Sequence, residues 1–185
     1  METERGEDEK MRSSESQNRV VIYTIGHSNL DLERFLDLLK ENEIEVLVDV
    51  RSVPFSRHVP QFNMKNIKER IKSAGIEYIF MEDEHAGNVL GGRPRDMACY
   101  ENGKIVYEYV MEKSWYKEGI SALIELADKK RTAVMCSEED PYRCHRHYLI
   151  TQSLIKKDAI VLHIRKDGRK EEVKKEKKTI QKKLF

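Results

Sequence analysis

Three segments of the sequence carry side chains that can move protons, attack an electrophile or hold an anion. They read GHS at 26–28, DVRSVPFSRHVPQF at 49–62 and CSEEDPYRCHR at 136–146. Histidine and aspartate act as general acids and bases, a cysteine thiolate is a nucleophile, and the planar fork of arginine suits phosphate. The residue types therefore indicate a site for an anionic substrate, although the three segments lie far apart in the chain.

Candidate roles can be assigned to individual residues. The candidate catalytic residues are His27, Asp49 and Cys136. The candidate substrate- or anion-binding residues are Ser28, Arg51, Ser56, Arg93, Cys144, His145 and Arg146. We prefer acid–base chemistry by His27 and Asp49 on a phosphate that Arg51 and Arg146 hold. Arg93 follows the glycine pair at 91–92, which permits a close approach of the backbone to a ligand.

A thiolate mechanism at Cys136 stays open beside acid–base chemistry. The cysteine is followed by a loop and the predicted start of a helix, where nearby cations would lower the pKa of its thiol. The segment also resembles the phosphate-binding loop of cysteine phosphatases. The arginine that those enzymes place six residues after the cysteine is here Tyr142, and Arg143 comes one position later.

Metal binding is the third chemistry that the same segment suggests. Cys136, Cys144, His145 and His27 are potential ligands, but their spacing is not that of paired zinc-binding cysteines. If residues 144–157 form one helix, adjacent side chains at 144 and 145 point about 100° apart. We therefore assign no metal ligand, and the sequence identifies no cofactor.

The elements that would position these residues follow from the apolar pattern. Strands are predicted at 19–25, 45–50, 76–80, 132–136 and 159–164, and helices at 31–43, 64–75, 104–113, 115–129 and 144–157. Strand–helix alternation with nearly continuous apolar strands predicts an α/β fold, a mostly parallel sheet with helices on both faces. The simplest arrangement is a doubly wound five-stranded sheet in the order 3-2-1-4-5, whose carboxyl edge would gather the three segments.

Composition sets limits on domain number, partners and location. A chain of 185 residues suits one domain, and its charged residues nearly cancel to +1, which favours neither nucleic acid nor a membrane as partner. No apolar run would span a bilayer, the charged start lacks a signal-peptide core, and three cysteines make no disulfide framework. We expect a cytoplasmic protein with no membrane partner, and its oligomeric state cannot be predicted.

Both ends of the chain read as tails around one domain. We expect a disordered tail at 1–18, the α/β domain at 19–165, and a charged tail at 166–185 that is a linker or a solvated helix. The last five residues, QKKLF, place Gln181 three positions before Leu184 and four before Phe185. This spacing resembles the peptides by which replication and repair proteins bind a sliding clamp, so we predict these three as partner-binding residues. An ordinary chain end is the alternative.

Taken together, the motifs resemble the family known as domain of unknown function 488. The resemblance is carried by YTIGHSNLDLERFLDLLKENEIEVLVDVRSVPFSRHVPQF at 23–62, LGGRP at 90–94 and VMCSEEDPYRCHR at 134–146, and it extends from about Ile22 to Ile164. The characteristic residues that it implies are Gly26, His27, Ser28, Asp49, Arg51, Pro54, Ser56, Gln61, Phe62, Gly91, Gly92, Cys136, Glu138, Pro141, Cys144, His145 and Arg146. The resemblance implies an α/β domain with a shared polar site, and it implies no reaction.

The residues themselves favour an enzyme that acts on a phosphate-bearing substrate, a nucleotide or nucleic acid, by hydrolysis or group transfer, with an association with DNA repair or replication. The alternative is a non-catalytic regulatory module that binds a metal or nucleic acid. Catalysis predicts His27, Asp49, Arg51 and Arg146 around one pocket. Metal binding instead predicts that the two sulfurs at 136 and 144 lie close together.

Overall fold

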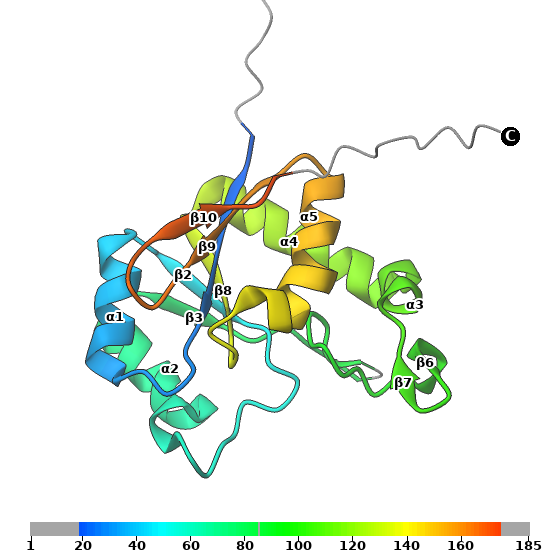
Figure 1. Ribbon diagram of the computed structural model, residues 1–185, viewed down its shortest axis with the longest axis horizontal. Helices are drawn as coiled ribbons and strands as arrows, with labels where there is room; N and C mark the ends of the chain where they lie inside the picture. The colour runs from blue at the N-terminus through cyan, green and yellow to red at the C-terminus, as the bar shows by residue number, and fades with distance from the viewer. Residues whose placement is uncertain (1–18, 85, 175–185) are drawn as a thin grey trace, which may run out of the picture.

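The computed structural model describes residues 19–84 and 86–174, which form a mixed α/β domain around one large sheet (Figure 1). The sheet has six strands in the order β10-β9-β1-β8-β2-β3. These strands are β1 (Val21–Gly26), β2 (Val46–Asp49), β3 (Glu77–Ile79), β8 (Thr132–Cys136), β9 (Ile160–Ile164) and β10 (Lys170–Glu172). Neighbouring strands pair in parallel except β10, which is antiparallel to β9. The prediction of a mostly parallel sheet is confirmed.

The predicted strand order is wrong, because β8 lies between β1 and β2. Ile22 of β1 and Val46 of β2 both pair with Thr132, on opposite sides of β8. The connection from β1 to β2 therefore skips one position in the sheet, and β8, which comes later in the chain, occupies that position. The predicted adjacency of β1 and β8 does hold, and it brings Gly26 beside Cys136 at the carboxyl edge.

The sixth strand, β10, lies beyond residue 165, where the sequence predicts the start of a charged linker or helix. Lys170 pairs with Ile164, and Glu172 pairs with Leu162. Because β10 is an edge strand, its side chains can stay charged and solvated, so the segment lacks the apolar pattern of a buried strand. The tail predictions for residues 1–18 and for Gln181, Leu184 and Phe185 lie outside the described residues.

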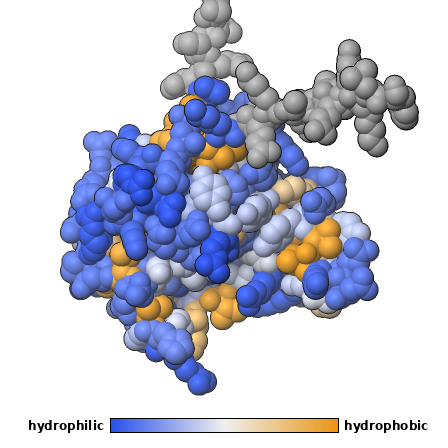
Figure 2. All heavy atoms as spheres, in the orientation of Figure 1, coloured by the Kyte–Doolittle hydropathy of each residue, from blue (hydrophilic) through white to orange (hydrophobic). Residues whose placement is uncertain are grey.

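Helices cover both faces of the sheet (Figure 1). They are α1 (Leu32–Glu41), α2 (Met64–Ser73), α3 (Tyr107–Glu112), α4 (Ser114–Lys129) and α5 (Gln152–Lys156). One core holds the apolar faces of α1 and α2, including Phe35 and Ile67, and the other holds those of α4 and α5, including Leu123 and Leu154. Burial on both faces explains why the central strands are apolar at nearly every position. By contrast, the face of the molecule in Figure 2 is mainly hydrophilic, with scattered hydrophobic patches.

The stretch between β3 and α3 consists of short elements. They are β4 (Glu82–Asp83), β5 (Gly87–Asn88), the 3-10 turn η2 (Met97–Cys99), β6 (Tyr100–Glu101) and β7 (Lys104–Ile105). The helix predicted at 104–113 begins later, at Tyr107, because residues 100–105 form a hairpin. Its turn residues Asn102 and Gly103 both have positive φ, the conformation that Asn-Gly hairpin turns adopt.

The helix predicted at 144–157 is broken at its start. Its place is taken by the 3-10 turn η3 (Pro141–Arg143), the π-helical segment η4 (Arg146–Thr151) and α5. Cys144 between the two turns has extended backbone angles, φ −133° and ψ 145°. The helical geometry that would point side chains 144 and 145 apart is therefore absent. Within the described ranges, no helix is long and apolar enough to cross a membrane.

Candidate functional site

A polar pocket of about 290 Å³ opens at the carboxyl edge of the sheet, where β2 and β8 end. Five of the predicted site residues line it: Arg51, Arg93, Cys136, Cys144 and His145. The pocket is also lined by Ser52, Tyr107, Ser137 and Glu138, which are not among the candidate catalytic or binding residues, and by Arg143, one of the cations expected near the Cys136 thiol. Glu138 is among the characteristic residues of the family resemblance, whereas Tyr107 is the first residue of α3.

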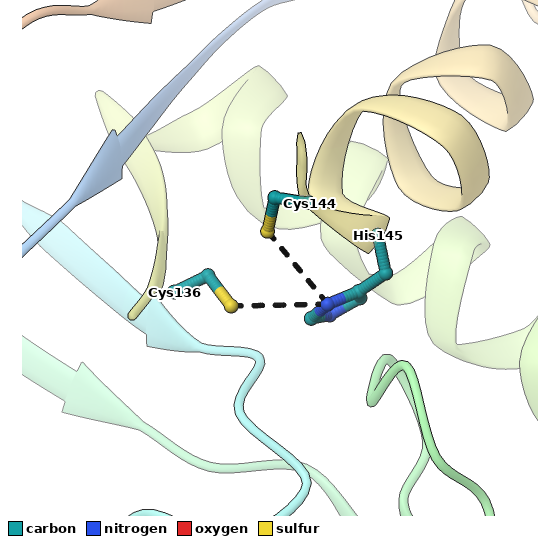
Figure 3. Close-up of side chains that lie close together, drawn as sticks. All are labelled: Cys136, Cys144 and His145. Carbon is teal, nitrogen blue, oxygen red and sulfur yellow. Dashed lines mark hydrogen bonds between the residues drawn. The ribbon is translucent and has the colours of Figure 1, made fainter. Parts of the chain in front are cut away.

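A cluster of two thiols and one imidazole lies in this pocket (Figure 3). Cys136 ends β8, and Cys144 and His145 begin the segment after η3. Nδ1 of His145 lies 3.7 Å from Sγ of Cys136 and 3.8 Å from Sγ of Cys144, and all three atoms lie within 4.8 Å of one another. The metal-binding alternative predicts that the sulfurs of Cys136 and Cys144 lie close together, and in the structure they do.

The orientation of the His145 ring identifies which of its nitrogens faces the thiols with a lone pair. Nε2 lies 3.1 Å from the carbonyl oxygen of Val50. A carbonyl only accepts hydrogen bonds, so Nε2 carries the proton and donates it. In the neutral ring Nδ1 is then unprotonated, and its lone pair is directed toward the sulfurs of Cys136 and Cys144. Gly92 packs against this ring, since a Cβ there would lie 2.6 Å from Cγ of His145.

Glu138 adds a carboxylate to the cluster. The thiol of Cys136 donates to Oε2 of Glu138 at 3.1 Å. Burial raises the pKa of Glu138, but the hydrogen bonds from Cys136 and Cys144 outweigh it, so the pKa lies below its usual value. The hydrogen bond with Cys136, together with burial, raises the pKa of the Cys144 thiol well above its usual range. A carboxylate beside the thiols does not favour a free thiolate nucleophile.

Arg51 forms the wall of the pocket and is held by a buried ion pair. Its Nε and one terminal nitrogen donate to the two carboxylate oxygens of Asp49 at 2.9 and 2.6 Å. Its other terminal nitrogen donates to the carbonyl of Phe62 at 2.8 Å and lies 3.3 Å from Nε2 of His27. A guanidinium has five N–H donors, so about one is left for a ligand. The hydroxyl of Tyr78 donates to the same Asp49 carboxylate at 2.6 Å.

His27 and Asp49 lie behind Arg51 and do not line the pocket. The ring of His27 stacks on Phe62 with centroids 4.2 Å apart, and its Nδ1 donates to the carbonyl of Ser28 at 2.9 Å. Burial, aided by the charge of Arg51, lowers the pKa of His27 to about 4. Both residues are nearly or fully buried, so in this geometry they position Arg51 and do not contact a ligand in the pocket.

The prediction that Arg146 holds an anion is wrong in this structure. Its guanidinium is fully buried and donates to the backbone carbonyls of Glu138 and Glu139. It therefore anchors the loop that follows β8. The close approach of this loop to β1 explains Gly26, because a Cβ there would overlap the carbonyl oxygen of Glu138.

The two candidate serines also serve the backbone and lie outside the pocket. Ser28 has a positive φ, and its N–H donates to the carbonyl of Ser137 at 2.7 Å. Oγ of Ser56 accepts from the N–H of His58 at 3.1 Å and so closes a turn. Arg93 differs from both, because its backbone is tied to Oγ of Ser52 at 2.8 Å while its side chain is exposed at the pocket.

A larger hollow of about 860 Å³ lies at the opposite edge, where the parallel strands begin. Its lining mixes cations such as Arg19 and Lys129 with acids such as Glu43 and Glu45, and it contains neither cysteine nor histidine. The smaller pocket is lined by basic, acidic and thiol side chains together. It lies at the carboxyl edge of the sheet, where parallel sheets bind ligands. We therefore take it as the candidate functional site.

Comparison with known proteins agrees with the resemblance seen in the motifs. The model of the family described as Domain of unknown function DUF488 matches residues 31–152, which is more than half of the chain. The matched range contains β2, β8, both pocket cysteines and His145. No curated protein and no solved structure matches the chain. The chain belongs to the family described as Domain of unknown function DUF488.

Proposed function

We propose that the protein is an enzyme that acts on a phosphate-bearing substrate, a nucleotide or nucleic acid, by hydrolysis or group transfer in the pocket at the ends of β2 and β8. The observation that carries this proposal is the meeting of exposed arginines and reactive groups in one pocket. Arg93 and Arg143 form no ion pair with another described residue, and they line the pocket with Cys136, Glu138 and His145. Charge-assisted hydrogen bonds to such arginines contribute about 1.5–3 kcal/mol each when shielded from water.

The size of the pocket limits what it encloses. A volume of about 290 Å³ is just below the range of about 300–1,000 Å³ for small-molecule sites. The pocket therefore suits a phosphate with the adjoining part of a nucleotide, and the rest of a larger substrate would extend over the rim. Val53 lines the pocket and is 72% exposed, and two residues further along the chain Phe55 is 64% exposed. An exposed aromatic side chain such as Phe55 provides a stacking surface for a base.

The proposed roles follow from position. Arg93 and Arg143 bind the phosphate, and Arg51, held by Asp49 and His27, supplies fixed positive charge at the wall. Glu138 is a carboxylate next to the thiols, so it can accept a proton from an attacking water or substrate hydroxyl. Glu138 lines the pocket, whereas His27 and Asp49 are buried behind Arg51, so Glu138 takes the proton-transfer role that the sequence predicts for those two residues.

A substrate panel tests the proposal. The full chain is assayed on phosphomonoesters, phosphodiesters, nucleotides, and single- and double-stranded DNA and RNA, with divalent metals varied. Arg93→Ala should lower kcat/KM by about tenfold or more, which corresponds to at least about 1.4 kcal/mol. Arg95→Ala is the matched control, because this exposed arginine lies two residues further on and outside the pocket. Turnover that Arg93→Ala leaves unchanged would contradict the proposed site.

A non-catalytic regulatory module is the second candidate, and the Cys136–Cys144–His145 cluster favours it. It predicts saturable binding of a metal or nucleic acid with no turnover anywhere in the panel. The association with DNA repair or replication through a sliding clamp stays a prediction about Gln181, Leu184 and Phe185, which lie outside the described residues.

A further inference from the structure

We infer that Cys136, Cys144 and His145 form a binding site for one zinc ion, with a fourth coordination position open to the pocket. All three residues line the pocket, so an ion among them would face its interior. Use of this ion in catalysis rests on the proposed function, whereas its binding does not.

The spacing of the three ligand atoms fits a tetrahedral ion. With zinc–sulfur bonds of about 2.3 Å and zinc–nitrogen bonds of about 2.0–2.1 Å, neighbouring sulfur and nitrogen ligands lie about 3.6 Å apart. In the structure Nδ1 of His145 lies 3.7 Å from one sulfur and 3.8 Å from the other. Both sulfur–nitrogen distances would shorten only slightly around the ion, and the two sulfurs, which lie within 4.8 Å of each other, would settle about 3.8 Å apart.

The surroundings of His145 support a role as ligand. Its Nε2–H donates to the carbonyl of Val50 at 3.1 Å, which leaves Nδ1 as the coordinating atom. Ligating histidines characteristically donate their other ring N–H to a carbonyl or carboxylate in this way, because the bond fixes both tautomer and ring orientation. Gly92 lets a backbone segment lie directly against the ring and restricts its movement.

The types of ligand select the metal. Two thiolates and one imidazole suit zinc, whereas magnesium and calcium prefer oxygen ligands. Three protein ligands with an open position are the pattern of catalytic zinc, in which water or a substrate oxygen takes the fourth place. Glu138, whose Oε2 lies 3.1 Å from Sγ of Cys136, is close enough to accept a proton from such a water.

Metal content of the full chain tests the inference directly. The protein is purified with a reductant that contains no thiol and without a chelator. It is then supplied with zinc, desalted, and analysed by elemental mass spectrometry. The wild type should retain about one zinc per chain, and Cys136→Ser and Cys144→Ser should each lose it. Cys99→Ser is the matched control, because Cys99 is a buried free thiol outside this cluster and should leave the zinc content unchanged.

A spectroscopic arm keeps the test decisive if a variant fails to fold. Zinc is removed from the wild type and replaced by Co²⁺, whose thiolate charge-transfer and d–d absorption report sulfur ligands and tetrahedral geometry. Both bands should appear, and they should persist in excess Mg²⁺. Wild-type protein that retains no zinc and develops no cobalt–thiolate absorption would overturn the inference, as would loss of metal in Cys99→Ser alone.

Failure of the metal site and failure of the proposed function give different results. Stoichiometric zinc without turnover of any phosphate-bearing substrate would contradict the proposed function and support the metal site. Turnover of the wild type that survives complete removal of bound zinc would overturn the catalytic use of the ion and leave the proposed function supported.

Discussion

The buried ion pair between Asp49 and Arg51 should be essential to the wall of the pocket. Asp49 is fully buried and accepts from Nε and a terminal nitrogen of Arg51 and from the hydroxyl of Tyr78. Asp49→Ala removes the counter-charge and leaves the guanidinium buried with unpaired donors. Breaking a buried ion pair from one side costs about 3–5 kcal/mol. For a chain of this size, that corresponds to a lowering of Tm by roughly 6–20 °C.

Urea unfolding and thermal melts measure this effect. Glu33→Ala serves as the control, because the Glu33–Arg70 pair is exposed and should contribute far less. Replacing both partners, in Asp49→Ala with Arg51→Met, should recover part of the stability that Asp49→Ala loses, since no buried charge is then left unpaired. If Asp49→Ala unfolds within about 1 kcal/mol of the wild type, the ion pair does not hold the wall and the structural role assigned to Asp49 is refuted.

Three further predictions concern pH, the histidine of the metal site and the chain end. Burial is the main cause that lowers the pKa of His163 to about 3 and of His27 to about 4, so each is neutral when folded and takes up a proton on unfolding below about 6.5. The free energy of unfolding should therefore fall as pH drops from 6.5 to 5, with a slope approaching about 1.4 kcal/mol per pH unit for each histidine. His163→Gln should reduce that slope, and an equal slope in the variant would contradict this account of His163. Gly92→Ala would place a Cβ 2.6 Å from Cγ of His145 and should weaken zinc binding about 10–100-fold in a competition titration, whereas unchanged affinity would show that the ring is not held there. A peptide covering residues 174–185 should bind the host's sliding clamp in a fluorescence titration. The clamp prediction fails if the peptide does not bind, or if Gln181→Ala together with Leu184→Ala leaves the binding unchanged.

The sequence predicts the layers of the fold better than the order of its strands. Continuous apolar runs indicate that a strand is buried on both faces, so the sequence predicts β1, β2 and β8 as strands of a parallel sheet. The runs do not record which strand lies beside which, so the position of β8 between β1 and β2 could not be read. The sequence does not predict β10, because an edge strand needs no apolar pattern and Lys170–Glu172 resembles a solvated tail.

The candidate site shows a similar division. Parallel strands share a carboxyl edge, so the sequence correctly brought Arg51, Cys136 and Cys144 together. The apolar pattern does not show which polar side chains point inward, so the sequence predicts substrate roles for Asp49 and Arg146, which the fold buries. The sequence predicts no metal ligand, because a regular helix from residue 144 would point the two adjacent side chains about 100° apart. After the turn that begins at Pro141, Cys144 is extended and His145 is helical, and Sγ of Cys144 lies 3.8 Å from Nδ1 of His145.

The most direct test of the central claim is a nuclear magnetic resonance titration of the full chain with a nucleoside monophosphate, with inorganic phosphate in parallel. Amide resonances of Gly92, Arg93, Ser137 and Cys144 should shift together and saturate, and Arg93→Ala should weaken the response while Arg95→Ala does not. Saturable shifts confined to the hollow around Arg19 and Arg131 at the other edge, or no saturable shifts with either ligand, would contradict a phosphate-binding site at the ends of β2 and β8.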